Sequence, residues 1–235
     1  MGGRATLAGP QRRPGRPPKE LATDTRVELL EAALELFARH GYAGTSVRMI
    51  ARSVGVSEAA MYAHFPGKRA MFEELLEHAG PRTVLQEMGA ADGELPVSDP
   101  ARFVRRLVER VWAGWEKPAA RRFLSILMRE GLISDPSTGV GLLAAIADMQ
   151  RELGSVFARW QAEGRVRVRG ATPEQLAWEL FSTVAVLRIL HAHADAGPAE
   201  LRRGREAMRR HVEFFVAAVF GDGAATGRGD DPADD

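Results

Sequence analysis

The chain has 235 residues, of which 45% are hydrophobic, and its formal net charge at pH 7 is +1. This apolar content is sufficient for a packed core and excludes a wholly disordered chain. The sequence contains no cysteine, which excludes disulfides, thiolate zinc sites and thiol redox sensing.

The charge is unevenly distributed along the chain. Residues 1–70 carry a net charge of +5 and the remaining residues carry −4. This distribution is typical of a protein whose N-terminal part binds nucleic acid and whose remaining part does not. No run of about 18 uncharged apolar residues predicts a membrane span, and the Pro- and Arg-rich start has no apolar core of a secretory signal. We therefore expect a cytoplasmic protein with no membrane partner.

Residues 1–20 are predicted to be a disordered basic arm, because they are rich in Gly, Pro and Arg and lack an apolar period. The segment around Gly15-Arg16-Pro17 resembles an AT-hook, in which an extended arm places guanidinium groups in the minor groove. The alternative is a solubilising tail that contacts phosphates without sequence preference. The candidate DNA contacts in this arm are Arg12, Arg13, Arg16 and Lys19.

Residues 21–79 are predicted to form three helices and an exit helix. In the first helix one apolar face carries Val27, Leu30, Leu34 and Phe37, and the helix ends at His40-Gly41. The exit helix follows Pro66-Gly67-Lys68 and carries Met71, Phe72, Leu75 and Leu76.

The sequence between these elements predicts two short helices joined by a tight turn, which is the pattern of a helix-turn-helix. Thr45 or Ser46 can cap the first of them, which continues with an apolar stripe from Val47 to Val54. Gly55 can adopt the left-handed conformation that ends a helix, and Ser57 can cap a second helix. Glu58 then suits the positive end of the helix dipole.

These residues resemble the N-terminal domain of the tetracycline-repressor (TetR) family of bacterial regulators. The resemblance covers about residues 23–76, and it rests on many short words in the family's order and spacing. These words are Ala32-Ala33-Leu34-Glu35-Leu36-Phe37, Gly41-Tyr42-Ala43-Gly44-Thr45-Ser46-Val47, Ile50-Ala51, Gly55-Val56-Ser57 and Met61-Tyr62-Ala63-His64-Phe65-Pro66-Gly67-Lys68. It implies an all-α fold with an N-terminal helix-turn-helix domain and a larger C-terminal domain that binds an effector and dimerises.

The resemblance also implies which residues contact DNA. It places Tyr62, Thr45 and Lys68 against backbone phosphates, a role that suits hydroxyl and ammonium groups near helix ends. The further candidates for facing DNA are Arg48, Ser57, Glu58, Ala59 and His64. For Arg48 two interpretations stay open, bidentate recognition of guanine and a phosphate contact.

Residues 80–220 are predicted to form the C-terminal helical domain, followed by a disordered tail at 221–235. Residues 80–98 are interpreted mostly as a connection, with one helical turn near 84–88, and residues 165–169 as an extended link. The Asp99-Pro100 and Thr172-Pro173 pairs predict helix starts. The predicted helices span residues 100–116, 118–131, 140–163, 173–194 and 201–220.

The last two helices, 173–194 and 201–220, have wide apolar faces. Leu176, Leu180, Val184, Leu187 and Leu190 form one stripe, and Met208, Val212, Phe215 and Val219 form another. We expect these helices to build a four-helix homodimer interface, as the resemblance also implies, because a palindromic site requires two-fold symmetry. The alternative is an intramolecular helix pair in a monomer.

Aromatic residues in this half are the candidates for an effector pocket. The predicted lining residues are Trp112, Trp115, Phe123, Met128, Trp160, Trp178, Phe181 and Arg188. Arg188 lies in an otherwise apolar helix, and two partners are open, an anionic effector or an acidic residue at the dimer interface. His191 and His193 are spaced poorly for chelation, and we expect neither a metal site nor a cofactor.

No enzyme signature accompanies this pattern: the sequence lacks a Gly-x-Ser-x-Gly elbow, a His-Glu-x-x-His motif and a dinucleotide fingerprint. We therefore expect no catalytic residues. The sequence predicts a homodimeric repressor that binds a palindromic DNA operator and is released by a small-molecule effector. A DNA-binding regulator controlled by a protein partner is the first alternative, and a helical enzyme is the remote one.

Overall fold

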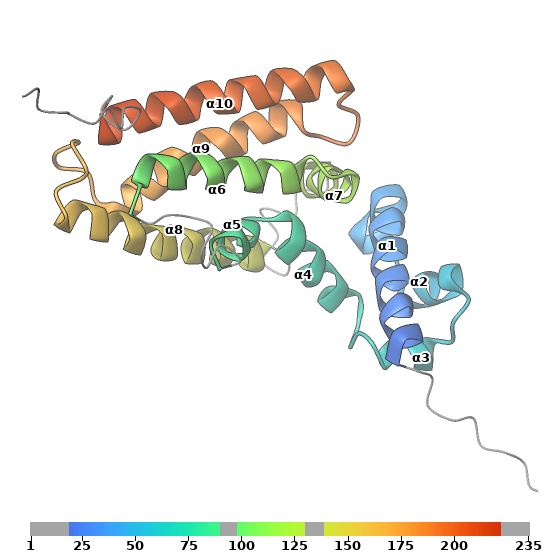
Figure 1. Ribbon diagram of the computed structural model, residues 1–235. Coiled ribbons are helices and arrows are strands. Elements are labelled where there is room, and N and C mark those ends of the chain that lie inside the picture. The colour runs from blue at the N-terminus through green and yellow to red at the C-terminus, as the bar shows by residue number, and fades with distance from the viewer. Residues whose placement is uncertain (1–18, 90–97, 130–138, 222–235) are drawn as a thin grey trace, which may run out of the picture.

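The computed structural model describes residues 19–89, 98–129 and 139–221, and the regular elements in these ranges are all helices. The predicted arm contacts Arg12, Arg13 and Arg16 and the C-terminal tail lie outside them. Figure 1 shows α1, α2 and α3 gathered at one end and α5, α6, α8, α9 and α10 stacked at the other, with α4 and α7 between them. The helices are α1 (Lys19–Gly44), α2 (Val47–Val54), α3 (Glu58–Tyr62), α4 (Lys68–Ala79), α5 (Arg82–Gly89), α6 (Pro100–Trp115), α7 (Pro118–Arg129), α8 (Gly139–Ala162), α9 (Pro173–His191) and α10 (Pro198–Phe220).

The predicted helix-turn-helix is present. The Ser46 side chain caps α2 by accepting a hydrogen bond from the Met49 N–H at 3.2 Å. Gly55 ends α2 in the left-handed region at φ 77°, and Ser57 caps α3. Gly41, at φ 76°, breaks the backbone of α1 where its end was predicted.

The buried face of α1 includes the predicted Leu34 and Phe37, while Leu30 is only partly buried and Val27 is outside the core. Leu29, Ala33, Leu34 and Phe37 are buried, whereas Val27 is 50% exposed. Val27 lies two residues before Leu29, which is about 200° around a helix of 3.6 residues per turn. A stripe drawn through Val27 therefore missed the true centre of the face.

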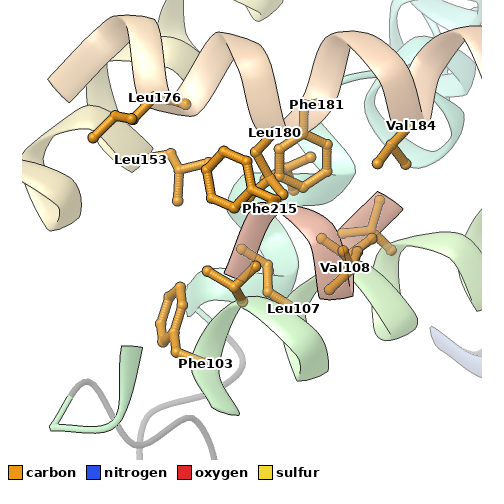
Figure 2. Packing of buried hydrophobic residues seen from close by; sticks show 14 of the residues in the cluster. Phe103, Leu107, Val108, Leu153, Leu176, Leu180, Phe181, Val184 and Phe215 are labelled. Atoms are coloured by element: carbon orange, nitrogen blue, oxygen red, sulfur yellow. The ribbon is translucent and has the colours of Figure 1, made fainter. Parts of the chain in front are cut away.

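The core of the larger part draws side chains from α6, α8, α9 and α10 (Figure 2). Phe103, Leu107 and Val108 of α6 and Leu153 of α8 converge there with residues of the last two helices. The residues from α9 and α10 are Leu176, Leu180, Phe181, Val184 and Phe215. The fold class is therefore all-α, as predicted.

Several helix boundaries differ from the prediction. α5 is a helix of eight residues, where only one turn was expected within a connection. α9 ends at His191 and not at Ala194, and α10 begins at Pro198 and not at Leu201. In the extended link between α8 and α9, the Arg167 N–H donates to the Val219 carbonyl at 2.7 Å, so this link is held against the end of α10.

Three ion pairs join α6 to α10. Arg105 forms a bidentate pair with Glu213, with a shortest distance of 2.7 Å, and Arg209 pairs with Glu109. The third pair joins Arg205 to Glu116, whose carboxylate also accepts a hydrogen bond from Trp112 Nε1 at 2.8 Å. These contacts fix one side of α10 and leave its opposite side uncovered.

α7 belongs to both parts of the molecule. Ala120, Phe123, Ile126 and Leu127 are buried in the cluster formed by α1 to α4. The ring of Phe123 lies 5.2 Å from that of Phe72 in α4, centroid to centroid. Figure 1 shows α7 directly beside α1. The helix-turn-helix end is therefore packed directly against α7.

Candidate nucleic-acid interface and ligand pocket

The short helix α3 has one anchored face and one open face. Met61 is fully buried, and Phe65, just beyond the helix, is 2% exposed. Glu58 and Ala59 are exposed, and 52% of Tyr62 is accessible. Ala60 and Ala63, the other small residues of this segment, are also exposed. Small side chains on this face let the helix approach a groove closely, with Tyr62 standing out from it.

Arg48 of α2 projects beside α3. Its side chain is 82% exposed, and Nε lies 3.9 Å from Glu58 Oε1. At this distance and exposure the pair is weak, so the guanidinium remains available to a phosphate or a base edge. His64 is half-buried, directly after α3. Arg52, in the last turn of α2, adds an exposed positive charge that was not predicted as a contact.

Two residues that the resemblance places against phosphates are engaged inside the protein. Thr45 is 1% exposed, and its hydroxyl donates to the Gly41 carbonyl at 2.8 Å. Lys68 Nζ donates to the carbonyls of Tyr42 at 2.7 Å and Thr45 at 2.8 Å. It also lies 4.5 Å from the centroid of the Tyr42 ring. The Lys68 ammonium therefore ties the start of α4 to the end of α1, and the Thr45 hydroxyl ties the α1–α2 connection to α1.

Two further predicted DNA contacts, Ser57 and Lys19, do not lie on the open face of α3 as free side chains. The Ser57 hydroxyl is occupied as the cap of α3, accepting from the Ala60 N–H at 3.1 Å. Lys19 is the first residue of α1, and the structure does not describe its side chain. The structure thus brings Arg48, Glu58, Ala59 and Tyr62 together on one open face.

An apolar cavity of about 320 Å³ lies between α7, α8 and α9, and the α4–α5 junction and the end of α6 contribute to its lining. Five of the eight predicted pocket residues line it, namely Trp115, Met128, Trp178, Phe181 and Arg188. The sequence reasoning missed the rest of the lining: Gly80, Pro81, Val84, Leu124, Leu127, Leu142, Ile146, Met149, Ser182, Ala185, Val186 and Ile189. The Gly80-Pro81 break was visible as a helix end, but periodicity does not tell which helices surround it.

Three predicted pocket residues lie elsewhere. Trp112 is buried in the core and bonds Glu116. Trp160 packs edge-on against Phe103 and Phe157, with ring centroids 5.3 Å away in both cases. Phe123 faces the helix-turn-helix side of α7. Each is a large aromatic on a buried face, and sequence alone does not distinguish the lining of a cavity from the interior of a core.

Arg188 is the charged residue of the cavity lining. It is 6% exposed, Nη2 donates to the Ala120 carbonyl of α7 at 3.2 Å, and the guanidinium carbon lies 4.5 Å from the Trp115 ring centroid. Burial lowers its pKa to about 9. Among the described residues no carboxylate forms an ion pair with Arg188, so within one protomer these residues do not supply its acidic partner.

The outward faces of α9 and α10 carry exposed apolar side chains. Val186 is 53%, Leu190 55% and Phe214 74% exposed. The two helices run antiparallel, and His211 Nε2 of α10 lies 3.0 Å from the Leu180 carbonyl of α9. Most of the two stripes predicted for the dimer interface is buried within the protomer, whereas Leu190 faces outward. The buried residues are Leu176, Leu180 and Val184 of α9 and Met208, Val212, Phe215 and Val219 of α10.

A second hollow, of about 920 Å³, lies between α1, α2 and the start of α7. It is wider and more open than the apolar cavity, and Glu28, Glu35, Arg39 and Arg122 are among its lining residues. Mixed charges of this kind are typical of a solvated groove. The smaller, apolar cavity is therefore the better candidate for binding a small molecule.

The described residues contain no cluster of three or more His, Asp or Glu side chains suited to a metal ion. His191 Nδ1 and His193 Nε2 both approach Glu200, at 3.7 and 3.9 Å. None of the helices in the described ranges has the length and apolar character needed to cross a membrane.

Comparisons with known proteins agree with this geometry. Residues 29–75 match the family described as "Bacterial regulatory proteins, tetR family". The "HTH-type transcriptional regulator AcrR" of Shigella flexneri is 30% identical over 140 residues, which are 57% of this chain and 60% of that protein. The chain spans 28 to 60% of the length of the first curated relatives that it matches.

Solved structures resemble the chain over a larger part of its length. NalD, the secondary repressor of the MexAB-OprM multidrug efflux pump in Pseudomonas aeruginosa, matches with a TM-score of 0.59 and 26% identity over 86% of this chain and 99% of that one. A SmeT–triclosan complex matches with a TM-score of 0.70 and 22% identity over 90% and 100%. At that identity the second match concerns the fold alone.

Proposed function

Because this chain belongs to the TetR family of transcriptional regulators, we propose that it is a repressor that binds a two-fold symmetric DNA operator as a homodimer. A small molecule in the apolar cavity releases it from the operator. The open face of α3 is the observation that carries the DNA-binding part. The family contains regulators and not enzymes, and a DNA-bound regulator works in the cytoplasm, where the bacterial chromosome lies.

On DNA, α3 is the recognition helix in the major groove. Its alanines permit close approach, and the Tyr62 hydroxyl and the Arg48 guanidinium reach phosphates or base edges from the same face. Thr45 and Lys68 act indirectly: the Thr45 hydroxyl holds the α1–α2 connection, and Lys68 fixes α4 against the end of α1. The basic arm with Arg12, Arg13, Arg16 and Lys19 adds contacts beside the helix-turn-helix.

The homodimer forms through the outward faces of α9 and α10. Exposed Val186, Leu190 and Phe214 are the support, because large apolar side chains on neighbouring helices mark an interaction surface. Pairing these helices with their copies makes a four-helix interface. The two-fold axis then places two α3 helices in successive major grooves, about 34–36 Å apart.

The position of α7 supports control by an effector. One side of this helix lines the cavity through Leu124, Leu127 and Met128, while Phe123 packs against Phe72 of the DNA-binding end. A ligand that binds better to one placement of α7 shifts the population toward it. The operator spacing then no longer suits the dimer. A regulator controlled only by a protein partner remains the alternative, and the cavity favours the ligand-controlled form.

Selection of bound duplexes from a random pool tests the proposal. The expected product is an inverted repeat whose half-sites lie about one helical turn apart. Arg48→Ala is expected to weaken binding to the selected duplex by about 1–3 kcal/mol, whereas the control Arg151→Ala, on the exposed surface of α8, leaves it unchanged. Recovery of no common motif, or equal effects of the two substitutions, contradicts the proposal.

A further inference from the structure

The apolar cavity contains two buried hydrogen-bond donors without an acceptor. Arg188 Nε and Trp115 Nε1 are both inaccessible to solvent and both lack a partner. Both residues line the cavity, and the guanidinium lies over the Trp115 ring. An unsatisfied buried donor is costly, and an unpaired buried charge is costlier. Two of them at one cavity indicate that the missing partner is an acceptor brought by a ligand.

The chemistry of the site restricts that acceptor. A guanidinium donates and never accepts, and its planar fork matches the two oxygens of a carboxylate. The other lining side chains are almost all apolar, with Ser182 as the further polar residue. The volume of about 320 Å³ lies at the lower end of the range for small-molecule sites. The cavity therefore fits a small molecule with one anionic end and an apolar body.

We propose that Arg188 binds the carboxylate of the effector, so that the ligand class of this regulator is small apolar organic acids. This inference rests on the proposed function, because it specifies the ligand of the same cavity. The Trp115 N–H provides a second donor, and Phe181 and Trp178 provide apolar walls. A carboxylate satisfies the buried charge, which no described side chain of the protein does.

The same contact links the ligand to α7. The hydrogen bond from Arg188 Nη2 goes to the carbonyl of Ala120, whose side chain is buried in the core of the DNA-binding end. A carboxylate competes with this carbonyl for the guanidinium. Binding of the acid therefore weakens a contact between α9 and α7, and α7 is the helix that packs against α1 and α4. An uncharged ligand in the apolar part of the cavity lacks this effect.

Calorimetric titration of the full chain at pH 7 with acid and amide pairs tests the proposal. The probes are benzoate, 1-naphthoate and octanoate with their neutral amides. At least one acid is expected to bind about tenfold or more tightly than its amide, which corresponds to about 1.4 kcal/mol. Arg188→Met should abolish this preference, Arg188→Lys should retain part of it, and Trp115→Phe should reduce acid binding less than Arg188→Met.

The control Arg159→Met removes an exposed charge of α8 and should leave the preference intact. Equal affinity for every acid and its amide, binding of none of the acids, or a preference that survives Arg188→Met overturns the inference. Operator binding is measured on the same samples. If the wild-type chain binds DNA specifically but does not prefer the acids to their amides, only the ligand class is refuted. If the wild-type chain shows no specific DNA binding, the proposed function is refuted.

Discussion

Truncation of Phe214 to alanine is the sharpest test of the proposed dimer. Phe214 is 74% exposed on the outward side of α10. An aromatic side chain buries roughly 200 Å², so enclosing the exposed part removes about 150 Å² from water in each protomer. At about 25 cal/mol per Å² this contributes roughly 3.7 kcal/mol for each protomer, and two-fold symmetry doubles it to about 7 kcal/mol.

Alanine keeps part of this contribution and the interface relaxes partly. We therefore expect Phe214→Ala to weaken the dimer by about 4–6 kcal/mol, which raises the dimer dissociation constant by about 10³- to 10⁴-fold. Sedimentation equilibrium over a dilution series measures this constant. The control Val27→Ala removes a half-exposed apolar side chain of α1 and should leave it unchanged. A change of less than threefold for Phe214→Ala would refute the placement of the interface.

Three further variants test the turn after α2, the buried charge of α9 and an ion pair between α6 and α10. Gly55→Ala should lower the free energy of unfolding by about 1–2 kcal/mol, because φ is 77° at a position with open space around its Cβ; no loss in chemical denaturation would contradict a left-handed turn. Arg188→Met should raise the free energy of unfolding by up to about 4 kcal/mol, because it removes an unpaired buried charge whose pKa burial lowers to about 9; a large loss of stability would mean that the guanidinium serves the fold. The hydrogen bond from Arg105 lowers the pKa of Glu213 below its ordinary value of 4.5, so the pair stabilises the fold above that value and is lost as pH falls through the lowered pKa. Because this carboxylate is more than half exposed, the loss is less than about 1 kcal/mol, and Glu213→Gln should flatten that part of the stability profile; an unchanged profile would contradict the role of the pair.

The sequence predicted the local features of the fold well, because helix caps and breaks depend on neighbouring residues. Ser46, Gly55, Ser57, Asp99 and Thr172 take the capping or terminating positions expected of them. At a helix start, a side chain that can hydrogen-bond the nearby backbone precedes a run of apolar residues with helical spacing. At a helix end, Gly follows such a run, because it has no Cβ.

Features that depend on which helices meet were less accessible. Thr45 and Tyr62 both carry a hydroxyl and both lie in the segment that resembles the TetR family. Thr45 is nevertheless buried, whereas Tyr62 is exposed. The reason is the break at Gly41, whose carbonyl takes the Thr45 hydroxyl. Similarly, Trp112 and Trp115 are three residues apart on one helix, and only Trp115 reaches the cavity, because Glu116 and α10 enclose Trp112.

The most direct test of the central claim is the affinity of the purified protein for the duplex upstream of its own coding region, compared with a random duplex and titrated with salt. We expect specific binding that exceeds random binding by ~10³ or more, with an affinity that falls steeply as salt rises. Equal affinity for that duplex, for the selected inverted repeat and for random DNA would contradict the claim that this chain is a sequence-specific regulator.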